Sequence, residues 1–167
     1  TSTYICYTKL TWTNDYDAAN FAALCGATGS VTVTFTATDA CGNDVSTVAT
    51  FTIVDTTNPI FTTDPQNEVV ECDGSGNTAA YNAWLAAYGN SVATDICGTV
   101  TYTYSVIDTA VLCGNTSRTT VQFTATDACG NNVSKQATFT IEDTTAPVIT
   151  TEAIAITIEC GNDASNQ

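Results

Sequence analysis

The most reactive side chains of this sequence belong to eight cysteines, and their spacing favours disulfide bonds over metal binding. Neighbouring cysteines are at least 16 residues apart, and the chain has no histidine. The close pairs of Cys or His that are typical of zinc sites are therefore missing. We expect a disulfide-bonded protein from an oxidising, extracellular compartment.

Acidic residues form the second group with a chemical role, because carboxylates bind hard cations such as calcium. The chain has 17 acidic and 3 basic residues, for a formal net charge of −14. Such a surface repels nucleic-acid phosphates and anionic membranes, so we expect no nucleic-acid partner. No apolar run approaches the roughly 20 residues that span a bilayer, so we also expect no membrane insertion.

Two groups of oxygen-bearing side chains are candidate calcium sites. Asp73 and Asn77 frame a Gly-Ser-Gly loop similar to the opening of a calcium loop, although the later Glu of an EF-hand is missing. The second group is expected at the junctions between repeats and consists of Asp55, Asp95, Asp127 and Asn131, with Asp143 at the following junction. In both groups the alternative is that these side chains cap turns by hydrogen-bonding the backbone.

The composition gives no support to catalysis. There is no histidine to act as a general base, and Lys9 and Lys135 lie within strand-like patterns. A carboxylate pair for glycoside hydrolysis would need a cleft lined by aromatic residues, whereas the tryptophans and tyrosines here fit packing positions. We expect that the protein is not an enzyme.

An internal repeat positions all of these groups. Residues 35–43 return unchanged as residues 123–131, an offset of 88. Four further pairs share the offset: Cys25 and Cys113, Asp55 and Asp143, Pro59 and Pro147, and Cys72 and Cys160. The repeat predicts three parts: the back portion of one module (1–57), a complete module (58–145) and the first strand of a third (146–167).

Within each repeat, alternation of threonine with apolar residues predicts β-strands, as at residues 31–38, 99–104 and 137–141. The Asp-Ala-Cys-Gly-Asn segments that follow such runs predict hairpin turns. Residues 78–88 break the alternation, because their aromatic residues and Leu85 recur at helical spacing before Gly89. We expect a β-sandwich with one short helix packed over an open end of its sheets.

The run TFTATDACGN, the strand after it and the exit Asp-Thr-Thr-Ala-Pro-Val-Ile resemble the hyalin-repeat branch of immunoglobulin-like sandwiches. The segments ECDGSGN, AWLA and TDICG resemble the version found in tandem in large secreted surface proteins of Bacteroidetes, including gliding-motility adhesins. The resemblance covers essentially the whole chain. It implies an all-β fold of tandem immunoglobulin-like β-sandwich modules with one short helix inserted per module, exported to the bacterial cell surface by type IX secretion.

An immunoglobulin-like strand order ranks the three ways to pair the four cysteines of the complete module. It puts the loops of Cys97 and Cys129 at one pole, and Cys72 and Cys113 at the other, roughly 30 Å away along the strands. Bridged Cα atoms must lie within about 7 Å, so bonds between the poles are disfavoured. The predicted bonds are Cys97–Cys129, Cys72–Cys113 and, in the first module, Cys6–Cys41.

Other residues are expected to form bonds beyond this scheme. Cys25 and Cys160 have no partner in it and are expected to pair outside this stretch of chain or between subunits. Thr56, Thr109 and Thr144 each follow an aspartate in triplets that resemble the O-glycosylation acceptors of Bacteroidetes. Triplets this short also arise by chance, which is the alternative.

These features predict a non-catalytic structural repeat of an extracellular adhesin, stalk or filament. Its partners would be neighbouring repeats or subunits of the same protein, together with surface glycans or other cells. The alternative is a carbohydrate-binding module of a secreted protein that uses exposed aromatic residues. A third interpretation is a homopolymeric filament in which a neighbouring copy supplies a strand.

Overall fold

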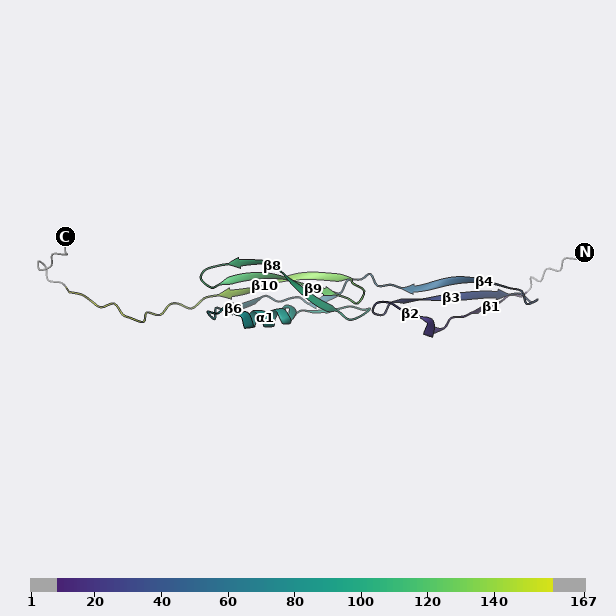
Figure 1. Cartoon of the computed structure of the whole chain (residues 1–167), viewed down its shortest axis with the longest axis horizontal. Coiled ribbons are helices and arrows are strands. Elements are labelled where there is room, and N and C mark those ends of the chain that lie inside the picture. The colour runs from purple at the N-terminus through teal and green to yellow at the C-terminus, as the bar shows by residue number, and fades with distance from the viewer. Residues whose placement is uncertain (1–8, 158–167) are drawn as a thin grey trace, which may run out of the picture.

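The computed structural model describes residues 9–157, which are mostly β-structure arranged in several sheets. The elements in chain order are β1 (Thr11–Asn14), η1 (Ala18–Asn20), β2 (Ala22–Ala23), β3 (Gly29–Thr38), β4 (Asp44–Ile53), β5 (Ile60–Thr63), β6 (Glu68–Glu71), α1 (Thr78–Ala86), η2 (Tyr88–Asn90), β7 (Val92–Thr94), β8 (Thr101–Val111), β9 (Ser117–Thr126) and β10 (Asn132–Glu142). Figure 1 shows two β-rich regions placed end to end, followed by an extended segment. We call them the N-terminal sheet (residues 11–53), the central unit (60–142) and the C-terminal segment (143–157). None of the helices in the described part of the chain is long and apolar enough to cross a membrane.

The N-terminal sheet is built around β3. This strand pairs antiparallel with β4 along one edge and with β1 and β2 along the other. Alternate residues of β3, including Val31, Val33 and Ala37, are buried, while Thr32 faces Thr50 across the hairpin at 3.0 Å between hydroxyl oxygens. The predicted strand at residues 31–38 and the predicted hairpin turn after it are confirmed.

The central unit has a four-stranded sheet in the order β6-β10-β9-β8 and a two-stranded sheet of β5 and β7. Strands β8, β9 and β10 are antiparallel neighbours, whereas β6 runs parallel to β10. One face of β9 and β10 is buried, because period-two alternation brings their apolar residues to the same side. The buried residues of this face are Val121, Phe123, Ala125, Ala137, Phe139 and Ile141.

The helix α1 forms within the predicted range but packs in a different place from the one expected. We predicted that it covers an open end of the sheets, whereas Trp84 and Leu85 are buried against the face of β9 and β10. The Trp84 ring meets Phe123 edge-on at 5.2 Å between centroids, and its indole N–H donates to the Gln66 carbonyl at 2.9 Å. The helix therefore forms part of the layer that covers the sheet.

The C-terminal segment contains no strand within the described residues. It leaves β10 at the end of the central unit opposite the N-terminal sheet and runs away from the rest of the molecule (Figure 1). Its apolar residues Val148, Ile149, Ile154 and Ile156 are exposed. We predicted the first strand of a third module at residues 146–167; residues 146–157 form no strand, and the rest of that range lies outside the described part of the chain.

Candidate functional site

The site begins with the turn at residues 127–131, which connects β9 to β10. The Asp127 carboxylate accepts the backbone N–H groups of Cys129 and Asn131 at 2.8 and 2.9 Å, and the Asn131 amide at 2.8 Å. Burial alone would raise the pKa of Asp127, but these hydrogen bonds, first of all those from Asn131, outweigh it and lower the pKa. The aspartate therefore acts as an ionised turn cap, the alternative that the sequence left open.

A second turn, at residues 24–28 of the N-terminal sheet, docks against this one. A disulfide joins Cys25 to Cys129 across 104 positions of sequence, with 5.0 Å between the Cα atoms. The backbone N–H of Ala27 donates to the Cys97 carbonyl at 2.7 Å, and the Asn131 amide donates to the Asp55 carbonyl at 3.3 Å. The two β-rich regions are thus joined by a covalent bond and by hydrogen bonds.

Gly26 allows the backbone of the 24–28 turn to lie close to the backbone at Cys97. It has a φ of 55°, in the left-handed region that favours glycine. A Cβ atom at this position would lie 2.2 Å from the Cys97 carbonyl oxygen. The buried Thr28 completes the turn by donating its hydroxyl to the Cys25 carbonyl at 2.6 Å. The sequence analysis missed both residues, although Cys-Gly-x-Thr recurs at residues 113–116 and could have indicated a repeated turn.

The disulfide corrects the pairing predicted from sequence. Cys129 bonds to Cys25 and not to Cys97, which is a free thiol. The two predicted loops do lie together, because Gly98 packs against Ala128. The prediction considered only the cysteines of one module. The N-terminal sheet brings a third cysteine, Cys25, to the pole where Cys97 and Cys129 lie. Cys25 therefore has its partner within the described chain.

The remaining predicted bonds have different outcomes. Cys72 and Cys113 are free thiols, so the predicted bond between them is wrong. Cys41 is disulfide-bonded, but Cys6, its predicted partner, lies outside the described residues. Cys160 also lies outside the described residues, and its expected partner beyond this stretch or in another subunit stays a prediction.

The junction also brings two of the predicted calcium ligands together. Ligand atoms of Asp55, Asp95 and Cys97 lie within 4.8 Å of one another, and all three residues are half-buried. Asp127 is not in this group, and its carboxylate accepts the Asn131 amide within the turn. Two carboxylates and a sulfur are a poor match to the six to eight oxygen ligands of calcium. Calcium at this position stays a prediction.

Cys97 is held in the protonated form by its surroundings. Burial raises the pKa of its thiol, and the nearby charges of Asp55, Asp95 and Asp127 raise it further. The thiolate is the nucleophile in disulfide exchange, so the raised pKa disfavours the reactive form of Cys97.

The other predicted calcium loop is a hydrogen-bonded turn. The Asp73 carboxylate accepts the backbone N–H groups of Ser75 and Asn77, which lower its pKa. The Asn77 side chain accepts the Asp73 N–H at 3.1 Å and donates to the Glu71 carbonyl at 2.8 Å. These contacts match the turn-capping alternative, and calcium binding there stays a prediction.

Asp143 lies at the opposite end of the central unit from Asp55, next to Glu71. Asp143 accepts the Thr145 N–H at 3.0 Å, as Asp55 accepts that of Thr57. The Glu71 carboxylate accepts the Thr144 N–H and both threonine hydroxyls, each at 2.9 Å. The Thr144 and Thr145 hydrogen bonds lower the pKa of Glu71. The sequence analysis did not identify this residue, which anchors the exit from β10.

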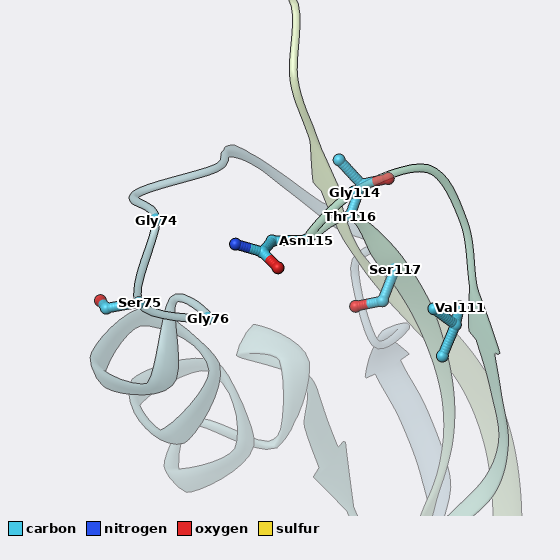
Figure 2. Close-up of a pocket in the computed structure, with 8 residues that line it drawn as sticks. All are labelled: Gly74, Ser75, Gly76, Val111, Gly114, Asn115, Thr116 and Ser117. Atoms are coloured by element: carbon cyan, nitrogen blue, oxygen red, sulfur yellow. The ribbon is translucent and has the colours of Figure 1, made fainter.

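A hollow of about 460 Å³ lies at the same end of the central unit (Figure 2). The loop that follows Cys72 forms one wall, and the turn that follows Cys113 forms the other. Asn115 extends into the space between the walls in Figure 2. The lining residues are Gly74, Ser75, Gly76, Val111, Gly114, Asn115, Thr116 and Ser117. Apart from Val111, the lining consists of glycines and small polar side chains.

The three predicted glycosylation positions are on the surface. Thr56, Thr109 and Thr144 are all exposed. The Thr109 hydroxyl lies 3.4 Å from that of Thr119, and the Thr144 hydroxyl donates to Glu71. Exposure is a requirement for modification, and modification itself stays a prediction.

Comparison with known proteins leaves the family open. No protein-family model matches this chain, and no curated protein matches it. The functional conclusion therefore depends on the residues and contacts of this chain.

Proposed function

We propose that this chain is a structural, non-catalytic segment of an extracellular bacterial adhesin, stalk or filament. It would be built from tandem immunoglobulin-like sandwich modules, each with one inserted helix. The observation that carries the proposal is the Cys25–Cys129 bond, which joins the N-terminal sheet to the central unit. A bond that closes a loop of about 100 residues stabilises a fold by roughly 4–5 kcal/mol in the loop-closure model. Covalent end-to-end joints suit a protein that builds length and transmits force.

The disulfide also supports an extracellular location, because such bonds persist in oxidising compartments. Cell-surface display through type IX secretion, and an origin in Bacteroidetes, rest on the sequence resemblance alone. Neighbouring repeats or subunits are the proposed partners, and surface glycans or other cells are the proposed targets. Charge repulsion is the reason to exclude nucleic acids.

The test of the structural role combines peptide mapping with small-angle X-ray scattering. Non-reducing digests of the wild-type chain should contain the Cys25–Cys129 peptide, and scattering should give one elongated particle. Cys25→Ser should leave both regions folded but broaden the distribution of dimensions, because the joint loosens. Cys72→Ser, which removes a free thiol away from the junction, is the matched control. Digests without the Cys25–Cys129 peptide would overturn the proposal.

Calcium is a proposed cofactor of this junction, supported by the closeness of the Asp55 and Asp95 carboxylates. The thiol of Cys97 in the same group argues for weak binding, because calcium prefers oxygen. Calorimetric titration of calcium into the wild-type chain and into Asp55→Asn with Asp95→Asn tests the site. Equal heats in both proteins would remove calcium from the proposal.

Carbohydrate binding is the second candidate function, and one surface favours it. Trp12 is exposed beside a hollow of about 470 Å³ that also includes Leu10, Asp39, Asn43 and Val45. An exposed aromatic ring beside polar side chains is a common arrangement in ligand sites. A glycan array that detects binding lost in Trp12→Ala and kept in Tyr16→Ala would favour this function over a purely structural one.

A further inference from the structure

The Cys25–Cys129 bond changes the shortest covalent route along the chain. The two cysteines are 104 positions apart in sequence, and they meet at the contact between the N-terminal sheet and the central unit. The shortest covalent route from residues before Cys25 to residues after Cys129 therefore passes through the bond and leaves out residues 26–128. The stretch that is left out includes most of the central unit, from β5 to β9. While the bond is intact, unfolding of this stretch cannot lengthen the chain.

Beyond the bond, this route runs along a single strand. Cys129 lies in the turn at residues 127–131, and β10 begins at Asn132 and ends at Glu142. Figure 1 shows that β10 leads from the junction to the opposite end of the central unit. A β-strand rises about 3.4 Å per residue, which is close to the limit of about 3.3–3.6 Å per residue for a fully extended chain. The strand is therefore almost at its full length before any tension acts on it.

The surrounding sheet holds β10 in this extended form. The strand lies between β6 and β9, and it pairs with β9 at every position from Asn132 to Ile141. Three of its apolar side chains are buried in the core, namely those of Ala137, Phe139 and Ile141. Tension that acts on both ends of β10 is carried by the covalent bonds of its backbone. It does not pull this strand past its neighbours.

Without the bond, tension would reach the central unit by a different route. It would enter through residues 54–59, which lead from β4 to β5 past the Asn131 side chain at the junction. It would leave through the end of β10 on the opposite side of the unit (Figure 1). Strands β5 and β10 belong to different sheets. The load would therefore pass between them through noncovalent contacts.

Those noncovalent contacts are centred on a short parallel ladder. Strand β6 follows β5 in the chain and pairs in parallel with β10 over the range Glu68–Glu71. One further backbone hydrogen bond, from the Cys72 N–H to the Glu142 carbonyl at 2.7 Å, extends this contact. Tension along the chain would pull β6 toward the junction and β10 away from it. When this ladder fails, the central unit can open and residues 60–128 can extend.

We propose that the Cys25–Cys129 bond and β10 form a load-bearing path that carries tension across the junction and through the central unit. With the bond intact, the folded central unit is inextensible under tension. Loss of the bond moves the load to the β6–β10 ladder and makes the same unit extensible. The inference rests on the proposed function, because a stalk or filament segment is pulled along its length. It adds the route of the force, which the structural role alone does not specify.

The experiment stretches single molecules of the full chain that are held at their two termini. The wild type should show no lengthening that corresponds to residues 60–128. Cys25→Ser with Cys129→Ser should lengthen by at least roughly 230–250 Å, for about 70 residues at about 3.3–3.6 Å each. Both cysteines are replaced so that neither thiol remains to pair with Cys97. Cys72→Ser removes a free thiol away from the junction and should behave like the wild type.

A second measurement uses the wild type alone, so it does not depend on the folding of the serine variant. Dithiothreitol, added at constant force, should produce the long extension in a molecule that showed none before. The reductant is oxidised to its cyclic disulfide, and its two electrons and two protons convert the Cys25–Cys129 bond into two thiols. In the serine variant, Phe123→Ala should lower the force at which the chain lengthens, because the ring is part of the core. In the bonded chain, Phe123→Ala should leave the trace unchanged.

Three outcomes would overturn the inference. The first is a long extension of the wild type before reduction, and the second is a serine variant or reduced chain that resists the same force without lengthening. The third is a changed trace for Phe123→Ala in the bonded chain, because the core would then carry load. Non-reducing digests of the same sample separate this failure from that of the proposed function. If they contain the Cys25–Cys129 peptide, the structural role stands and only the load path is wrong.

Discussion

The N-terminal sheet and the central unit contain the same nine-residue stretch and the same hairpin, yet they differ in where the hydrophobic side chains lie. Phe123 is fully buried under Trp84, while Phe35 at the identical repeat position is 38% exposed. The strands themselves are alike, since β3 and β9 each pair with the next strand over ten positions. The difference lies in the covering layer, because α1 and β6 shield only the central unit.

This comparison teaches that a hairpin with an alternating pattern forms by local rules, while its core depends on what packs against it. Burial of one large side chain stabilises a fold by about 1.5–3 kcal/mol, so a sheet with one open face gains less from the same sequence. Among the described residues, Phe35 and Phe51 of the N-terminal sheet stay exposed, so we expect this region to be the less stable of the two.

The largest expected effect compares Phe123→Ala with Phe35→Ala. Phe123→Ala should destabilise the central unit by about 3–5 kcal/mol, because a buried ring leaves a cavity. Phe35→Ala should cost about 1 kcal/mol or less in the monomer, since solvent already reaches the ring. Urea unfolding followed by Trp84 fluorescence for the first variant and Trp12 fluorescence for the second checks both values. Equal losses would mean that the N-terminal sheet has a covered core as well.

The next effect compares Gly26→Ala with Gly114→Ala. Both glycines have left-handed φ angles, 55° and 58°, so each substitution carries a similar backbone cost of about 1–2 kcal/mol. Only Gly26 lies against the Cys97 carbonyl, so only Gly26→Ala should push the two regions apart. Alkylation of the half-buried Cys97 thiol should speed up in Gly26→Ala and stay unchanged in Gly114→Ala. The same rate in both variants would contradict the close approach at the junction.

A smaller effect on stability is expected only at acidic pH. It concerns Asp39 and Asp127, which occupy equivalent positions in the two turns. Hydrogen bonds lower the pKa of both Asp39 and Asp127 in the folded state. Each ionised carboxylate therefore contributes to the free energy of unfolding. This contribution is complete above the carboxyl pKa of the unfolded chain, about 4, and is lost as the pH falls through the lowered pKa of the folded state. Thermal unfolding between pH 6 and pH 2 should therefore depend less on pH below 4 in Asp127→Asn than in the wild type. Asp39→Asn should flatten the profile of the N-terminal sheet in the same range, and an unchanged slope in both variants would contradict this role.

The smallest effect concerns the ion pair of the central unit. Lys135 on β10 lies 2.6 Å from the Asp64 carboxylate, and both side chains are largely exposed. Thr47 occupies the repeat position of Lys135 in the N-terminal sheet, where no such pair can form. Lys135→Met should cost at most about 1 kcal/mol, because exposed ion pairs contribute little. Denaturation at low and high salt checks this, and a loss above 2 kcal/mol would mean that the pair holds β10 to the β5 region.

Much of the fold followed from periodicity. Alternating threonine and apolar residues predicted strands that overlap β3, β8 and β10, and Asp-Ala-Cys-Gly-Asn predicted both hairpin turns. The helix range also followed, because Tyr81, Trp84, Leu85 and Tyr88 recur at helical spacing. The position of the helix on the sheet face could not be predicted in this way. Helical spacing indicates which side of the helix is apolar, but not which surface that side packs against.

The candidate site was predicted less well. The sequence analysis placed Cys97 near Cys129 and expected Asp55 to meet Asp95 at a junction, and both expectations fit the structure. It assigned the wrong partner to Cys129, because the pairing of cysteines depends on Cα distances across a contact between two regions. It also missed Gly26 and Glu71, whose importance comes from backbone atoms of distant residues.

By itself, the sequence determined that this protein forms paired strands with acidic turns, because side-chain period and turn chemistry act over a few residues. The tertiary structure alone decided which face of each sheet is covered and which cysteine Cys129 binds. Those outcomes depend on distances between residues about 100 positions apart, and a local pattern contains no information about such distances.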